Sequence, residues 1–245
     1  MLKVNHISTM YQDGTKAITD INLHIQNGDI YGFIGANGAG KSTTIKAIVG
    51  IHHFNQGEIW IDGYSIKTDP VNCKKRIAFI PDNPDLYEHL TGLQYISFIA
   101  DIFEVPLTER KQSIEKYSTI FEMTSKLNNS IASYSHGMKQ RIALIAALVH
   151  KPALFILDEP FVGLDPTASF ELKRLMQEHA ENGGAVFFST HVLEVAQKLC
   201  NKVAIIHKGS LVKNGLMEEV AGSKSLEEIF MEVRNESKNM DIIQK

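Results

Sequence analysis

The sequence predicts an α/β protein with a mostly parallel sheet, an N-terminal antiparallel β subdomain and an inserted α-helical subdomain. Three observations lead to this fold. Short apolar segments alternate with helical segments in the last third of the chain, which is the order of a parallel sheet. A glycine-rich loop joins an apolar segment to a helical one near the N-terminus. A long helical stretch separates the two groups of predicted strands.

The composition is that of a globular protein. The 245 residues are 44% hydrophobic and 22% charged, which is close to the globular average. A chain of this length can bury a sizeable core without disulfides or structural metals. The net charge of −3 argues against a nucleic-acid partner. The two cysteines, Cys73 and Cys200, lack metal-ligand spacing, which indicates free thiols in a reducing compartment.

No targeting or membrane-spanning segment is evident. The first six residues lack the apolar core of a secretion signal. No apolar run approaches the roughly 20 residues that a spanning helix needs. We therefore expect a cytoplasmic protein that is peripheral to the membrane and reaches it only through a partner.

The N-terminal third has the alternation and turn signals of strands. Strands are predicted over residues 2–6, 18–25, 30–34, 56–63 and 76–80. The first two alternate apolar and polar residues and are separated by the hairpin signal Asp13-Gly14. Residues 30–34 are almost continuously apolar, which predicts a strand buried on both faces. A helix is expected to begin near Lys41.

Helical periodicity dominates the middle of the chain. Apolar residues recur at helical spacing in two segments, around residues 93–100 and 114–121. Thr108 is a predicted N-cap of the second helix. Strand character returns at residues 154–157, 185–189 and 203–206, with helices between them. Lys208-Gly209 predicts a final hairpin turn, and an apolar stripe near residues 226–233 predicts a terminal helix docked on the body.

A nine-residue loop matches the phosphate-binding pattern G-x-x-x-x-G-K-[ST]. It consists of Gly35, Ala36, Asn37, Gly38, Ala39, Gly40, Lys41, Ser42 and Thr43. Its backbone N–H groups and the start of the following helix suit phosphate oxygens. Lys41 is expected to neutralise the β- and γ-phosphates of ATP, and Ser42 to hold Mg²⁺. The pattern follows a predicted buried strand and opens a predicted helix, so it predicts a P-loop NTPase core.

Two carboxylates end the apolar strand at residues 154–157. In open α/β sheets ligands bind at the carboxyl ends of the strands. Asp158 is therefore a predicted Mg²⁺ ligand, acting through water. Glu159 is predicted to orient or deprotonate the attacking water.

Beyond these two sites, the order of motifs resembles that of ATPase subunits of ABC transporters over residues 1–235. Tyr134-Ser135-His136-Gly137-Met138 resembles the family's L-S-G-G-Q signature. Gly163-Leu164-Asp165 resembles the loop that lines the dimer interface, and Phe188-Ser189-Thr190-His191 resembles the switch-histidine loop. Tyr11 resembles the aromatic residue that stacks on adenine. Residues 86–91 and 225–230 resemble those of bacterial drug- and peptide-exporting members.

Two positions depart from the family pattern. His136 stands where the family usually has glycine, but Gly137 is kept, so contact with ATP should survive. Asp82 stands where the family usually has glutamine. It is either a Mg²⁺ ligand or part of a loop that faces the membrane partner.

The resemblance implies a single ATPase domain over residues 1–245. Residues 1–82 and 153–217 would form the ATP-binding core, 83–152 the helical subdomain and 218–245 a helical tail. The resemblance also implies a head-to-tail homodimer or heterodimer. The catalytic residues would be Glu159 and His191, with Tyr11 and the loop on the nucleotide. The opposite subunit would supply Ser135, Gly137 and Met138.

ATP-driven closure of this dimer would power a separate membrane-spanning permease subunit, with export as the expected direction. Two alternatives stay open at this point. The ATPase could act on a soluble scaffold, as iron–sulfur assembly relatives do, or the chain could be a regulatory module that binds ATP without hydrolysing it.

Overall fold

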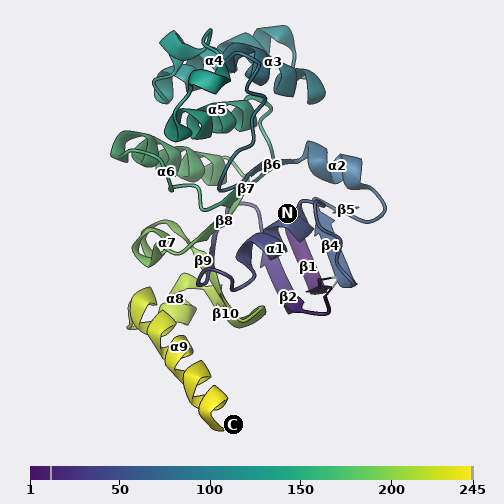
Figure 1. Cartoon of the computed structure of the whole chain (residues 1–245), viewed down its shortest axis with the longest axis vertical. Helices are drawn as coiled ribbons and strands as arrows, with labels where there is room; N and C mark the ends of the chain where they lie inside the picture. The colour runs from purple at the N-terminus through teal and green to yellow at the C-terminus, as the bar shows by residue number, and fades with distance from the viewer. Residues whose placement is uncertain (12, 244–245) are drawn as a thin grey trace.

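Two sheets and a group of helices make up the molecule (Figure 1). The computed structural model describes the backbone of residues 1–11 and 13–243, and the side chains of residues 1–11 and 13–235. Within these residues, no helix has both the length and the apolar character needed to cross a membrane. The predicted α/β fold is confirmed.

A mostly parallel six-stranded sheet forms the centre, with the strand order β10-β9-β3-β8-β7-β6. Its strands are β3 (Ile30–Ile34), β6 (Ile77–Ile80), β7 (Leu154–Asp158), β8 (Ala185–Thr190), β9 (Lys202–His207) and β10 (Ser210–Leu216). Only β10 runs antiparallel to its neighbour, as its short hairpin with β9 requires. The glycine-rich loop follows β3 and the paired carboxylates end β7, so both sites lie at one edge of the sheet.

This sheet separates two apolar cores. Along β8, Phe187 packs with the antiparallel sheet and Phe188 packs on the opposite side with the other helices. Along β7, Ile156 and Leu157 divide in the same way. A strand buried on both faces needs apolar residues at every position, which explains the continuous apolar runs in the sequence.

A second, antiparallel sheet covers one face, with the order β2-β1-β4-β5. Its strands are β1 (Leu2–Met10), β2 (Lys16–Ile25), β4 (Gln56–Ile61) and β5 (Tyr64–Ser65). Helix α1 (Lys41–Ile48) packs in the core between the two sheets. The bulges between β1 and β2 interrupt the alternation of apolar residues, and both strands are longer than predicted.

The other face carries the remaining long helices. Figure 1 shows α3 (Gly92–Ile102), α4 (Leu107–Ile120) and α5 (His136–Val149) gathered beyond one end of the sheet. Helices α6 (Pro166–Glu181) and α7 (Leu193–Leu199) follow β7 and β8. Helices α8 (Met217–Ala221) and α9 (Leu226–Ile243) end the described chain. Leu226, Ile229 and Val233 are buried, so the apolar stripe of the tail docks on the body; residues 244–245 lie outside the described residues.

The structure corrects two details of the sequence-based reading. Thr108 is not an N-cap, because α4 already begins at Leu107 and the N-cap position belongs to Pro106, whose ψ of 142° is not helical. A further helix, α2 (Pro70–Lys75), was not predicted. Its six residues are too few to show helical periodicity, although Asp69 caps it and Pro70 opens it.

Candidate active site

The glycine-rich loop leaves β3 and packs tightly on neighbouring strands. A Cβ on Gly35 would lie 2.7 Å from the Cγ2 of Ile206 in β9, and one on Gly40 would lie 2.9 Å from the Cγ2 of Ile18 in β2. Gly40 also has a φ of +107°, which favours glycine. The two positions require glycine for close approach, and the loop is thereby fixed against both sheets.

Lys41 opens α1, and its ammonium turns back into the loop. Nζ donates to the carbonyl of Gly35 at 2.8 Å and to that of Ala36 at 3.4 Å. It also lies 3.3 Å from Oε1 of Glu159. The side chain is only 6% exposed, so the structure holds a buried cation at the place where phosphate oxygens are expected.

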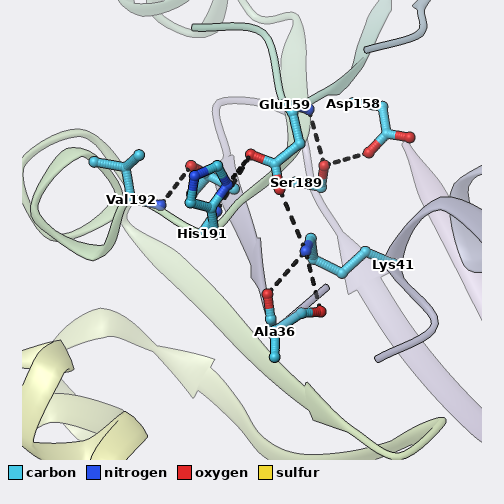
Figure 2. Close-up of polar contacts among 9 residues, drawn as sticks. Ala36, Lys41, Asp158, Glu159, Ser189, His191 and Val192 are labelled. Carbon is cyan, nitrogen blue, oxygen red and sulfur yellow. Dashed lines mark hydrogen bonds and ion pairs between the residues drawn. The ribbon is translucent and has the colours of Figure 1, made fainter. Parts of the chain in front are cut away.

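Ser189 connects the two carboxylates at the end of β7 with the neighbouring strand β8. Its hydroxyl donates to Oδ1 of Asp158 at 2.5 Å and accepts from the backbone N–H of Glu159 at 3.0 Å (Figure 2). Asp158 is buried. This hydroxyl is a positioning group that was not predicted, although its place at the end of a strand next to β7 was a usable signal.

Glu159 lies between a cation and an imidazole (Figure 2). Its Oε2 is 2.9 Å from Nδ1 of His191 and accepts from the backbone N–H of His191 at 3.3 Å. Its other oxygen faces Lys41 at an ion-pair distance, without a directed hydrogen bond. The backbone of Glu159 has a φ of +50°. Seven other described residues besides the glycines have a similar φ, between +46° and +56°, so this conformation alone does not single out the site.

A cavity of about 600 Å³ opens beside these groups, within the size range of small-molecule sites. The predicted residues that line it are Tyr11, Ala36, Asn37, Gly38, Gly40, Lys41, Ser42, Thr43, Asp82 and Glu159. The hydroxyls of Tyr11 and Thr43 are 3.0 Å apart. Gly35, Ala39, Asp158 and His191 are not part of the lining; the first two shape the loop, and the last two adjoin Glu159.

Five lining residues were not predicted: Thr15, Lys16, Ala17, Lys208 and Gly209. The turn between β9 and β10 reaches the cavity because Gly209 donates its N–H to Ala39 at 2.9 Å and accepts from Thr19 at 2.8 Å. A turn after a strand parallel to β3 must lie at the ligand edge of the sheet. The position of this turn at the cavity follows from the order of the strands in the sheet and not from the local sequence.

Ser135, Gly137 and Met138 lie at the start of α5 and do not reach the cavity. Ser135 is the N-cap, and its Oγ accepts from the N–H of Met138 at 3.3 Å. A Cβ on Gly137 would lie 2.8 Å from the carbonyl of Gly163. Within one chain, these residues therefore adjoin the loop after Glu159 and are separate from the phosphate loop.

The donors at the cavity suit a hard cation that is shared with phosphate. The hydroxyl of Ser42 is exposed there, and the carboxylate of Asp82 also lines the cavity. No group of three or more His, Cys, Asp or Glu side chains gathers into a metal site within the described residues. Mg²⁺ prefers one or two protein oxygens together with substrate phosphates, and this donor set fits that preference.

Comparisons with known proteins agree on one family. The family model for ABC transporters matches residues 18–162. The ABC transporter ATP-binding protein NatA of Bacillus subtilis is 32% identical over 238 residues, which cover 94% of this chain and 97% of NatA. The bacitracin transport ATP-binding protein BcrA of Bacillus licheniformis is 34% identical over 214 residues, which cover 87% of this chain and 69% of BcrA.

Solved structures show the same likeness. The structure of an ATP-binding subunit of an ABC transporter matches with a TM-score of 0.92 and 32% identity, over 96% of this chain and 99% of that one. The structure of cbiO1 from Clostridium perfringens, part of the ABC transporter complex cbiONQ, matches with a TM-score of 0.77 and 26% identity, over 98% of each chain.

Proposed function

Because this chain belongs to the ABC transporter family as an ATP-binding subunit with ATPase activity, we propose that it energises export through a separate membrane-spanning permease. It would act at the cytoplasmic face of the membrane. The observation that carries this proposal is a shared segment, residues 81–85, which adjoins both the nucleotide cavity and a second, apolar pocket. The likeness to BcrA, named as a bacitracin transport ATP-binding protein, supports a transport role. The export direction rests on the resemblance of residues 86–91 and 225–230 to exporting members.

ATP would occupy the cavity, with its phosphates in the loop and its base beside Tyr11. Lys41 is already aimed at this space and held by carbonyl oxygens, so little reorganisation is needed for it to contact the β- and γ-phosphates. Ser42, Asp158 and Asp82 are the residues that would hold Mg²⁺, the last two directly or through water. When bound, Mg²⁺ would neutralise charge on the phosphates.

Glu159 would orient the attacking water and accept its proton. The contact with His191 fixes one carboxylate oxygen, which leaves the other directed toward the phosphate side of the cavity, where Lys41 lies. Positioning of this kind is the main contribution a protein makes to phosphoryl transfer. His191 would keep the carboxylate in place as the charge near it changes.

The second half of each site would come from another subunit. Ser135, Gly137 and Met138 lie at an exposed helix start outside this chain's own cavity. The N-terminus of a helix suits an anion, so in a head-to-tail pair this segment would meet the γ-phosphate that the opposite subunit holds. The partner subunit would be a second copy or a related chain.

The permease would dock at the second pocket, which has a volume of about 200 Å³. It is lined mainly by apolar side chains of β6, α3 and α5, and by Pro81, Pro84 and Asp85. Asp82 lies within the same short segment and lines the nucleotide cavity. A change at the nucleotide would therefore move residues that touch the docked partner.

A substitution in this pocket tests the proposal. Ile99→Glu places a charge in the apolar lining, and we expect the protein to lose co-purification with a polytopic membrane protein. The ATPase activity of the isolated variant should persist, which also reports on folding. Leu107→Glu is the matched control, because Leu107 is 77% exposed and lies outside the pocket. If the wild-type protein co-purified with a soluble scaffold and never with membranes, the proposed permease partner would be contradicted.

A further inference from the structure

The imidazole of His136 lies directly against Gly163. His136 is the first residue of α5, and Gly163 belongs to the loop that follows Glu159. A Cβ on Gly163 would lie 2.5 Å from Cδ2 and 2.9 Å from Nε2 of His136. Cβ atoms essentially never lie this close to another heavy atom, so the ring occupies the space that a side chain at residue 163 would need.

A second contact joins the same two segments. Arg141, further along α5, forms an ion pair with Asp165, the N-cap residue of α6. Residues 159–165, here called the carboxylate loop, begin at Glu159, whose carbonyl accepts from the N–H of Val162 at 3.1 Å. The loop is thus turned on itself at one end and is capped and ion-paired at the other. Between the two ends it contacts the ring of His136 and the closely approaching backbone of Gly137.

We infer that His136 is a positioning residue for Glu159, acting as a wedge that holds the carboxylate loop at a fixed distance from the start of α5. This inference rests on the proposed catalytic role of Glu159. Without the ring, Gly163 would lose the side chain whose atoms lie nearest to it on the side where a Cβ would point. The strained turn at Glu159 would then sample other positions.

His136 supports Gly163 through van der Waals contact of its ring. No hydrogen bond joins the imidazole of His136 to another group in the described part of the chain. Phenylalanine offers a flat ring of similar breadth without titratable nitrogens. His136→Phe should therefore keep most of the function, whereas His136→Ala removes the wedge.

The contact itself is tested by thermal unfolding. Gly163 and Gly183 have nearly equal φ angles, +81° and +85°, but nothing lies within 4 Å of a Cβ on Gly183. Gly183→Ala should lower the Tm by about 2–4 °C through backbone strain alone. Gly163→Ala should lower it further, because the exposed ring of His136 must turn away from the new Cβ. Adding His136→Ala should bring the double variant back near the Gly183→Ala value, and additive losses would overturn the contact.

Steady-state kinetics test the role. We expect His136→Ala to lower kcat by about 10- to 100-fold, as small misplacements of a catalytic group do, with KM for ATP unchanged. His136→Phe should keep kcat within about threefold of wild type and show the same pH profile. Wild-type kcat in His136→Ala would overturn the inference, and so would a loss confined to KM, which would indicate direct contact with nucleotide.

Two further results separate this inference from the proposed function. His136→Ala in a Glu159→Gln background should still form the ATP-dependent dimer, because a positioning role leaves nucleotide binding intact; loss of that dimer would overturn the inference. Unchanged turnover in Glu159→Gln alone would instead defeat the proposed function, while the Tm comparison would still report on the contact of His136 with Gly163.

Discussion

The ammonium of Lys41 already has oxygen partners where phosphate is expected to bind. Two loop carbonyls and one oxygen of Glu159 surround it, and a buried cation requires such compensation. Phosphate oxygens would join or replace these partners at little structural cost. The charge at this one position therefore decides whether the loop binds nucleotide or is only a turn.

Removing that charge should abolish useful ATP binding. Lys41→Ala deletes charge-assisted contacts, each of which is worth about 1.5–3 kcal/mol, so the affinity should fall by at least about 10- to 100-fold. Titration with a fluorescent ATP analogue measures this loss. Lys46→Ala is the control, because Lys46 lies on the same helix and does not line the cavity. Wild-type affinity in Lys41→Ala would refute the assignment of the loop.

Asp82 is the second residue whose role a single substitution decides. Its carboxylate lines the cavity. If it belongs to the Mg²⁺ shell, Asp82→Asn should raise the Mg²⁺ concentration for half-maximal turnover by up to about tenfold. Asp85→Asn is the control, because Asp85 lies in the same segment and lines the apolar pocket but not the nucleotide cavity. An unchanged Mg²⁺ titration in Asp82→Asn would decide against the metal role.

At the scale of elements, the C-terminal ends of α3 and α5 meet through two stacked rings. Phe103 and His150 have ring centroids 3.7 Å apart and nearly parallel planes. Burial lowers the pKa of His150 to about 4. A helix C-terminus favours a protonated histidine, but here the cost of desolvating the charge is larger.

This burial makes stability depend on pH. The unfolded chain takes up a proton near pH 6.5, whereas the folded protein does so only near pH 4. Above pH 6.5, where His150 is neutral in both states, its burial does not reduce the free energy of unfolding. As the pH falls from 6.5 toward 4, the free energy of unfolding decreases by up to about 1.4 kcal/mol per pH unit. Denaturant unfolding of His150→Phe should show a smaller loss between pH 7 and 5 than wild type. Equal losses would show that His150 does not titrate in this way.

The elements differ in how far the sequence could predict them. The strand at residues 30–34 and the phosphate loop were predictable because burial on both faces and a fixed glycine spacing leave local patterns. Helix α2 could not be predicted, because its six residues are too few to show a helical periodicity of apolar residues. The placement of Lys16 and Lys208 beside the cavity depends on how two sheets and a hairpin approach each other, and no local pattern records such an approach.

At the scale of the whole molecule, the proposed catalytic groups lie in two places. The cavity with Lys41 and Glu159 is at one edge of the central sheet, whereas Ser135 caps α5 outside that cavity. Within one chain, Ser135 therefore does not line the cavity in which nucleotide is proposed to bind. We therefore expect ATP to join two subunits, and Glu159 to end this state by hydrolysis.

The most direct test is the oligomeric state of Glu159→Gln, measured by sedimentation velocity with and without ATP and Mg²⁺. The substitution removes the base, which should lower turnover by about 10²- to 10⁴-fold, and it removes a negative charge near the γ-phosphate. We predict a dimer with nucleotide and a monomer without it, and no dimer when Ser135→Arg is added. A Glu159→Gln protein that binds ATP, stays monomeric and still hydrolyses it would contradict both the catalytic role and the shared site.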